Sequence, residues 1–140
     1  MVGNHENYDD MSPLRVDQLA HITVLNERRK PLREIKGYQQ QRTFNVSQYV
    51  KEHIYMFGGE SITVTFKAKR SIVNQILDWF DGNVEFTNIT ADNVVCRVRV
   101  NHDAFKYWAL QYMQSVKVLT PASLVTEVKA AIEEGLHQYS

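Results

Sequence analysis

The chain has 140 residues, of which 44% are hydrophobic, and this length and composition suit one domain with a substantial core. Sixteen basic residues balance sixteen acidic ones, so the zero net charge excludes a global field for DNA or anionic lipid and leaves any nucleic-acid site as a local patch. Cys96 is the only cysteine, which excludes an internal disulfide. With no signal sequence and no apolar run that could cross a bilayer, we expect a cytoplasmic protein without membrane contact.

The first third of the chain carries little regular patterning. Residues 15–27 alternate loosely, with Leu19, Ile22 and Val24 at apolar positions, and this pattern predicts a strand. Because a lone strand cannot satisfy its backbone, we expect these three side chains to pack on the sheet, on a helix or on a second copy of the chain. Residues 28–43 are polar and charged without a period, which predicts a linker.

A helix and two strands are predicted after this linker. Apolar residues recur at helical spacing between Val46 and Phe57, and Gly58-Gly59 then ends the pattern. Residues 62–69 and 94–101 each alternate between an apolar and a polar face, which predicts two half-buried strands.

Each of these strands is followed by an amphipathic helix and a short closing strand. Ile76 and Phe80 lie on the apolar stripe of the first helix, and Trp108 and Tyr112 hold the corresponding core positions in the second. The same offset separates the matching positions, so the sequence repeats a β-α-β unit. Two such units predict an α+β fold, a ferredoxin-like split β-α-β (βαββαβ) sandwich with the first and third strands at the centre and both helices on one face.

An extra helix is predicted at the C-terminus. Thr120-Pro121 provides an N-cap and a first helical residue, and apolar residues recur at helical spacing from Leu124 to Leu136. This helix packs either back on the domain or on a partner.

Four segments carry a recognisable set of motifs. They are YDDMSPLRVDQLAHITVLNERRKPL from Tyr8, FNVSQYVKEHIYMFGGESITVTF from Phe44, ILDWFDGNVEF from Ile76 and YWALQYMQSVKVLTPASLVTEV from Tyr107. Together they resemble the C-terminal half of bacterial WYL-domain transcriptional regulators, in which a winged helix-turn-helix precedes an Sm-like β-barrel, the WYL domain, and a ferredoxin-like extension called WCX. The resemblance implies that residues 1–27 are a remnant of the WYL barrel, 28–43 a linker and 44–140 a WCX-type domain.

The same resemblance implies a non-enzymatic ligand-sensing and dimerisation module. Members of the family are thought to bind nucleic-acid-derived ligands, such as single-stranded DNA or nucleotides, and often act as homodimers. Operator DNA would be bound only through the helix-turn-helix, which this chain lacks, so the resemblance implies a fragment of a longer regulator. The alternative is a stand-alone ferredoxin-like domain that binds a nucleotide or single-stranded nucleic acid.

Basic residues are the candidate ligand contacts. They are Arg15, Lys67, Lys69, Arg97 and Arg99. The last four are predicted on the uncovered face of the two central strands, where facing like charges cost stability unless an anion or an acidic partner neutralises them. This face holds a nucleic-acid backbone, meets an acidic strip across a dimer, or is simply solvated. Because it lacks aromatic residues, it would position phosphates more than it would read bases.

Arg15 is a candidate through the resemblance alone. The family strand is matched here by Leu14-Arg15-Val16-Asp17-Gln18-Leu19, in which the arginine and the aspartate agree while Leu14 and Gln18 depart from the pattern. Arg15 either faces a ligand or pairs with Asp17.

Motifs for catalysis and for metal binding are missing from the sequence. There is no GxSxG, no glycine-rich phosphate loop and no pair of histidines at metal-ligand spacing. Cys96 alternates inward with Val94 and Val98, which predicts an inert, buried thiol. We therefore expect no enzymatic activity, no cofactor and no metal.

Overall fold

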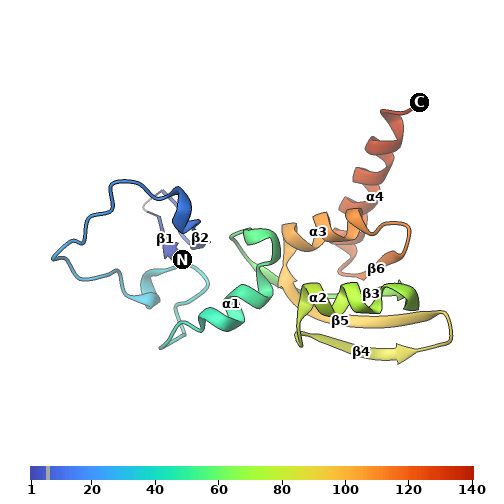
Figure 1. The fold of residues 1–140 in the computed structure, drawn as a ribbon, viewed down its shortest axis with the longest axis horizontal. Coiled ribbons are helices and arrows are strands. Elements are labelled where there is room, and N and C mark those ends of the chain that lie inside the picture. Colours follow the sequence, from blue (N-terminus) through green and yellow to red (C-terminus); the bar gives the residue numbers. More distant parts are fainter. Residues whose placement is uncertain (6) are drawn as a thin grey trace.

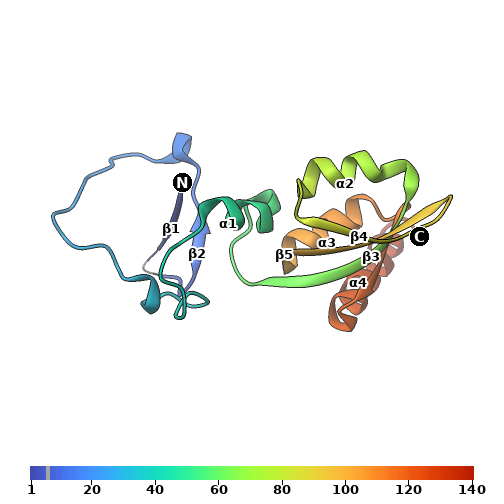
Figure 2. The same ribbon diagram turned by 90° about the horizontal axis from the view of Figure 1, so that it is seen from below.

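A small N-terminal pair of strands and a larger α+β domain make up the computed structural model, which describes residues 1–5 and 7–140 (Figure 1). β1 (Val2–Asn4) and β2 (Met11–Pro13) pair in antiparallel fashion. α1 (Val46–Glu52) lies between this pair and the sheet of the larger domain, as Figures 1 and 2 show. This helix therefore links the two parts.

The larger domain is built on a four-stranded antiparallel sheet with the order β4-β5-β3-β6. Its strands are β3 (Ser61–Lys69), β4 (Val84–Ile89), β5 (Asn93–Asn101) and β6 (Val116–Thr120). β3 and β5, the first and third strands of the repeat, lie at the centre as predicted. The ferredoxin-like α+β fold is confirmed.

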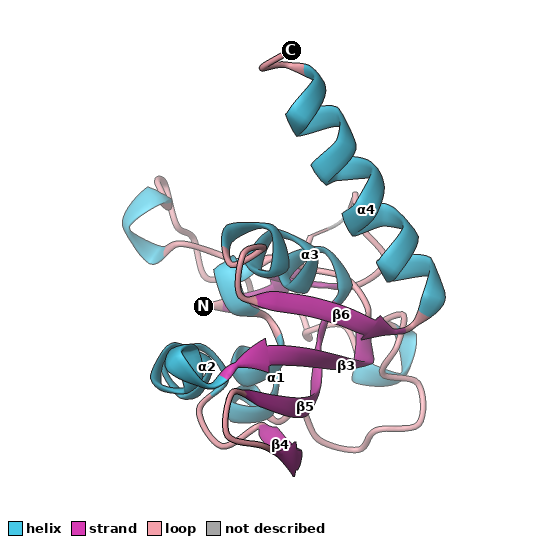
Figure 3. Ribbon diagram, turned by 90° about the vertical axis from the view of Figure 1, so that its right-hand side faces the viewer, coloured by secondary structure: helices cyan, strands magenta, loops and turns pink. Residues whose placement is uncertain are grey.

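Two helices cover one face of this sheet. α2 (Val73–Phe80) and α3 (His102–Gln111) lie side by side on it (Figures 2 and 3). α2 ends as predicted, because Asp81 follows it and Gly82 adopts a φ of 69°, in the left-handed region that glycine tolerates. Ile76 and Trp108, which correspond in the repeat, are both fully buried, so the repeated unit is confirmed in three dimensions.

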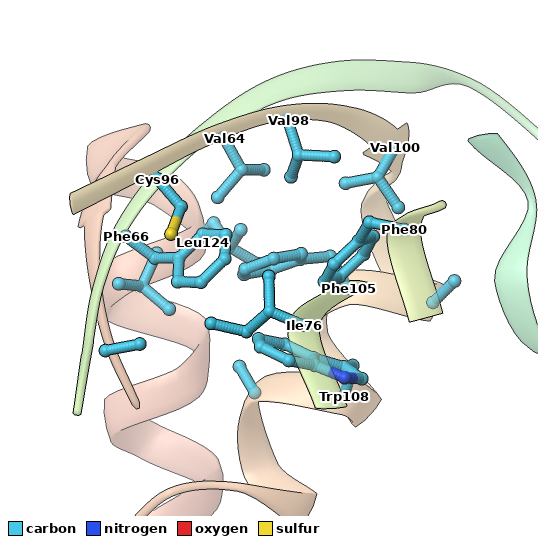
Figure 4. Close-up of a cluster of buried hydrophobic side chains, with 14 of the residues drawn as sticks. Val64, Phe66, Ile76, Phe80, Cys96, Val98, Val100, Phe105, Trp108 and Leu124 are labelled. Atoms are coloured by element: carbon cyan, nitrogen blue, oxygen red, sulfur yellow. The ribbon is translucent and has the colours of Figure 1, made fainter. Parts of the chain in front are cut away.

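The hydrophobic core lies between the sheet and these helices (Figure 4). Its largest fully buried side chains come from β3, α2, α3, β5 and the C-terminal helix α4 (Ala122–His137), and they include Phe66, Ile76, Phe80, Cys96, Phe105, Trp108 and Leu124. The predicted aromatic stripe is therefore mostly core. Tyr112 is only half-buried, and its hydroxyl accepts a hydrogen bond of 3.3 Å from Nε1 of Trp79.

Cys96 is buried in this core, and burial raises the pKa of its thiol to about 11. Because only the thiolate is nucleophilic, we expect the folded protein to resist a thiol reagent such as dithiobis(nitrobenzoate) at pH 8. In denaturant the same thiol should react rapidly. Rapid reaction of the folded chain would contradict the burial of this side chain.

Asn101 joins the start of α3 to the turn before β3. Its Oδ1 accepts a hydrogen bond of 3.0 Å from the Ala104 amide, and its Nδ2 donates to the carbonyl oxygens of Gly58 and Glu60 at 3.0 and 3.3 Å. Asn101→Ala removes the helix cap and these two bonds, so it should lower the free energy of unfolding by about 2 kcal/mol in a urea titration. Asn74→Ala, on the exposed face of α2, serves as the control and should change it by less than about 0.5 kcal/mol.

The predicted strand over residues 15–27 is wrong. The chain forms a single 3-10 turn at Val16–Gln18 and then no regular structure as far as residue 27. No strand among the described residues pairs with this segment, so nothing would complete its backbone hydrogen bonds. Ile22 and Val24 are 71% and 92% exposed, and Leu19 is half-buried, so the packing expected within the chain is wrong for the first two. Their contact with a second copy stays a prediction.

Residues 28–43 contain more packing than a polar linker requires. They include a 3-10 turn at Leu32–Glu34, and Ile35 is buried in a second small cluster with Met11 and Tyr49. The domain boundaries predicted at residues 27 and 43 stay a prediction.

The helix predicted between Val46 and Phe57 is shorter in the structure. α1 ends at Glu52, and a 3-10 turn at Ile54–Met56 follows it.

The first half of α4 (Ala122–His137) packs back on the domain, which was one of the two alternatives for the last helix, and packing on a partner stays a prediction. α4 begins one residue later than predicted, because Thr120 still belongs to β6 and Pro121 precedes the helix. Leu124 and Val128 are buried in the core, whereas the C-terminal half projects away from the domain and leaves Leu136 70% exposed (Figures 1 and 3). Among the described residues, no helix has the length and apolar character needed to cross a membrane.

Candidate nucleic-acid interface

Strand alternation places the four predicted basic strand residues on the face of the sheet opposite α2 and α3. In the register of the central strands, Thr65 lies opposite Arg97 and Thr63 opposite Arg99. Lys67 and Lys69 follow on the same face of β3, and all four basic side chains are exposed. The structure therefore brings these residues together as predicted, while their role in binding stays a prediction.

Lys117 is a further member of this face that the sequence analysis missed. It lies on β6 directly opposite Lys67 in the register of the two strands. Its neighbour Val118 is buried in the core, so the alternation of β6 turns Lys117 toward the open side. We call Lys67, Lys69, Arg97 and Lys117 the basic face.

The charges of the basic face are not neutralised by close carboxylates. Among the described residues, none of its four side chains has a carboxylate oxygen within 4.0 Å of its nitrogens. Glu85 lies opposite Arg97 in the register of β4 and β5 but forms no ion pair with it. Lys67 and Lys117 face each other directly, and like charges in that arrangement destabilise a sheet. An anion bound over them would remove this cost.

Arg99, at the end of the same face, differs because it has an acidic partner. Its Nε lies 3.3 Å from Oε1 of Glu52, and the arginine side chain is 56% exposed while that of the glutamate is 12% exposed. The same carboxylate oxygen accepts a hydrogen bond of 2.7 Å from Nε2 of Gln48. Sequence patterning carried no signal for this pair, because α1 and β5 are far apart along the chain.

A cleft of about 470 Å³ opens beside Arg99. It is formed by β2, the segment before α1, α1 itself and the start of β3, and its lining includes Tyr38, Phe44, Tyr49, Glu52, Ser61 and Arg99. The Tyr49 hydroxyl donates a hydrogen bond of 3.1 Å to the Met11 carbonyl oxygen, which ties α1 to β2. Burial, with smaller effects from Tyr38 and Asp10, raises the pKa of this hydroxyl to about 12, so it remains a donor at neutral pH.

Arg15 lies apart from the basic face. It belongs to the N-terminal part, which Figure 1 shows beyond α1 from the sheet. Its Nε donates a hydrogen bond of 3.1 Å to Oδ1 of Asp17, and this bond lowers the pKa of the aspartate. Of the two alternatives for Arg15, the structure shows the pair with Asp17, and a contact with ligand stays a prediction.

The chemistry available on the open side of the sheet is that of phosphate binding. Thr63, Thr65 and Val95 lie among the basic side chains, so this part of the sheet offers no ring on which a base could stack. Within the described ranges, no three or more His, Cys, Asp or Glu side chains gather closely enough to hold a metal ion.

The strand order and helix placement define a ferredoxin-like α+β domain with one face covered by helices and one open, cationic face. The family model of the WCX domain matches residues 59–136, which is more than half of the chain. The chain therefore belongs to the WCX domain family. No curated protein matches it.

Proposed function

We propose that the chain is a ligand-sensing and dimerisation module of a bacterial transcriptional regulator, which acts in the cytoplasm and has no enzymatic activity. Its membership in the WCX family supports this proposal, because WCX domains are found with WYL-domain regulators. The proposed ligand is a nucleotide or a single-stranded nucleic acid whose phosphates lie on the basic face.

The observation that carries this ligand class is the uncompensated charge on the open sheet. Four cations gather on adjacent strands of a chain whose net charge is zero, and Lys67 directly faces Lys117. A row of phosphates carries the charge to neutralise several of these side chains at once, and the affinity gained would depend strongly on salt. Without stacking rings, such a face would hold a backbone with little preference for base sequence.

The test is a fluorescence-anisotropy titration of the chain against a fluorescein-labelled, single-stranded thymidine oligonucleotide of about 12 nucleotides. If each cation of the basic face neutralises one phosphate, a plot of log affinity against log salt concentration should have a slope of about −2.8. Competition with an unlabelled nucleoside triphosphate distinguishes a nucleotide ligand from a longer strand. Absence of binding at low salt would overturn the proposed ligand class.

Dimerisation is supported by the projecting half of α4. Ile132 and Leu136 continue the stripe that buries Leu124 and Val128, yet they are exposed in the single chain. Light scattering after size-exclusion chromatography should give twice the 16.3 kDa mass of one chain. Leu136→Glu should shift that mass toward the monomer, because it places a charge in the apolar stripe. A monomeric wild-type chain at all concentrations would contradict dimerisation.

A further inference from the structure

The only carboxylate that forms an ion pair with the open sheet, among the described residues, comes from α1 and is almost buried. Glu52 has a side-chain exposure of 12%, although a buried carboxylate is costly unless it is paired and hydrogen-bonded. Gln48 supplies one hydrogen bond, and Arg99 supplies the only opposite charge within 4.0 Å among the described residues. The buried position of Glu52 therefore depends on Arg99.

In the ion pair between Glu52 and Arg99, an anion from solvent can replace the glutamate as the partner of the arginine. Nε of Arg99 and Oε1 of Glu52 lie 3.3 Å apart, a longer distance than in the bidentate arginine–carboxylate pairs that are strongest. The guanidinium is more than half exposed, so an anion from solvent can reach it. Arg97 lies two residues away on the same face of β5, so a phosphate chain that runs along β5 from the basic face would reach Arg99.

α1 is also the element through which the N-terminal pair of strands is attached. Tyr49 hydrogen-bonds to Met11 of β2, and His53 places its ring nitrogens 2.8 and 3.0 Å from the carbonyl oxygens of Tyr49 and Gly59. If α1 moves relative to the sheet, the N-terminal pair of strands, which is bonded to α1, should move as well.

We propose that Glu52 is an internal competitor for Arg99, and that an anionic ligand on the basic face displaces it and loosens α1 from the sheet. This inference rests on the proposed function, because it assigns a regulatory contact to the same binding face. The contact lowers the affinity for the ligand and couples occupancy of the sheet to the placement of α1.

The first test measures the affinity of the fluorescein-labelled thymidine oligonucleotide for four chains: wild type, Glu52→Gln, Arg99→Gln and the double variant. Glutamine keeps the acceptor for Gln48 but removes the charge, so Glu52→Gln should tighten binding by about threefold or more at low salt. In the Arg99→Gln background the same change should have little effect. Glu133→Gln on α4, which changes the net charge equally, should leave the affinity unchanged.

The second test measures hydrogen exchange of the α1 amides with and without saturating oligonucleotide. The amides of Tyr49 and His53 donate hydrogen bonds of 3.0 Å to the carbonyl oxygens of Asn45 and Tyr49, in the first and last turns of α1, and their exchange should accelerate when the ligand is bound. Unchanged or slower exchange in α1 would overturn the release of this helix.

The remaining outcomes separate the two proposals. If the wild type binds and Glu52→Gln binds equally or more weakly, internal competition is overturned while the proposed function stands. If none of the four chains binds at low salt, the proposed ligand class is overturned, and the competition fails with it.

Discussion

A chain carrying both Lys67→Glu and Arg97→Glu is expected to lose its affinity for single-stranded oligonucleotide. Each substitution removes a cation that would contact a phosphate and adds a charge that repels one. The salt dependence of any residual binding should fall by about 1.4 in log–log slope, because two contacts are lost. The fold should survive, since both side chains are exposed, and the favourable pair that Lys67→Glu makes with Lys117 offsets the repulsion that Arg97→Glu creates with Glu85. Anisotropy titrations and a circular-dichroism spectrum measure the two effects.

The control for this experiment changes the net charge equally at a distance from the basic face. Arg28→Glu with Lys129→Glu meets that need, because both residues are exposed and lie outside the sheet. It breaks one surface pair between Lys129 and Glu133, which is worth little. Equal loss of binding in this variant would mean that overall charge, rather than the basic face, governs the affinity.

Trp108→Ala is expected to lower the free energy of unfolding by about 3–5 kcal/mol, a large share of the stability of a domain of this size. The indole is fully buried, and its ring centroid lies 4.8 Å from that of Phe80 and 5.3 Å from that of Phe66. Alanine would remove these contacts and leave a cavity between α3 and the sheet. Urea denaturation followed by far-ultraviolet circular dichroism measures the change.

Tyr139→Ala provides the matched aromatic control. Tyr139 is 93% exposed after the end of α4, so its loss should change the stability by less than about 0.5 kcal/mol. A cost below about 1 kcal/mol for Trp108→Ala would contradict the central place of this side chain in the core.

The ferredoxin-like domain was predictable because its signals are periodic. β3 and β5 alternate along most of their length, so one face of each is buried, and the stripes of α2 and α3 repeat at helical spacing. The repeat fixes strand order through the known handedness of β-α-β connections. The same alternation placed the four basic strand residues on one face. Applied to the closing strand β6, it would also have placed Lys117 on that face.

The N-terminal third was not predictable in the same way. Loose alternation in residues 15–27 resembles a strand, but a strand exists only with a partner, and the local sequence does not say whether one is present. The burial of Ile35 with Met11 and Tyr49 depends on contacts between distant segments. The role of Glu52 could not be predicted for the same reason. Its partner Arg99 lies on β5, far along the chain, and hydrophobic periodicity within α1 carries no information about that contact.

The most direct test of the basic face is a titration of the isotopically labelled chain with the thymidine oligonucleotide, followed by two-dimensional amide NMR. If phosphates lie on this face, the largest shifts should fall on the amides of Lys67, Arg97 and Lys117 and their strand neighbours, while those of α2 and α3 change little. Shifts confined to the helical face, or none at saturating oligonucleotide, would contradict ligand binding on the open sheet.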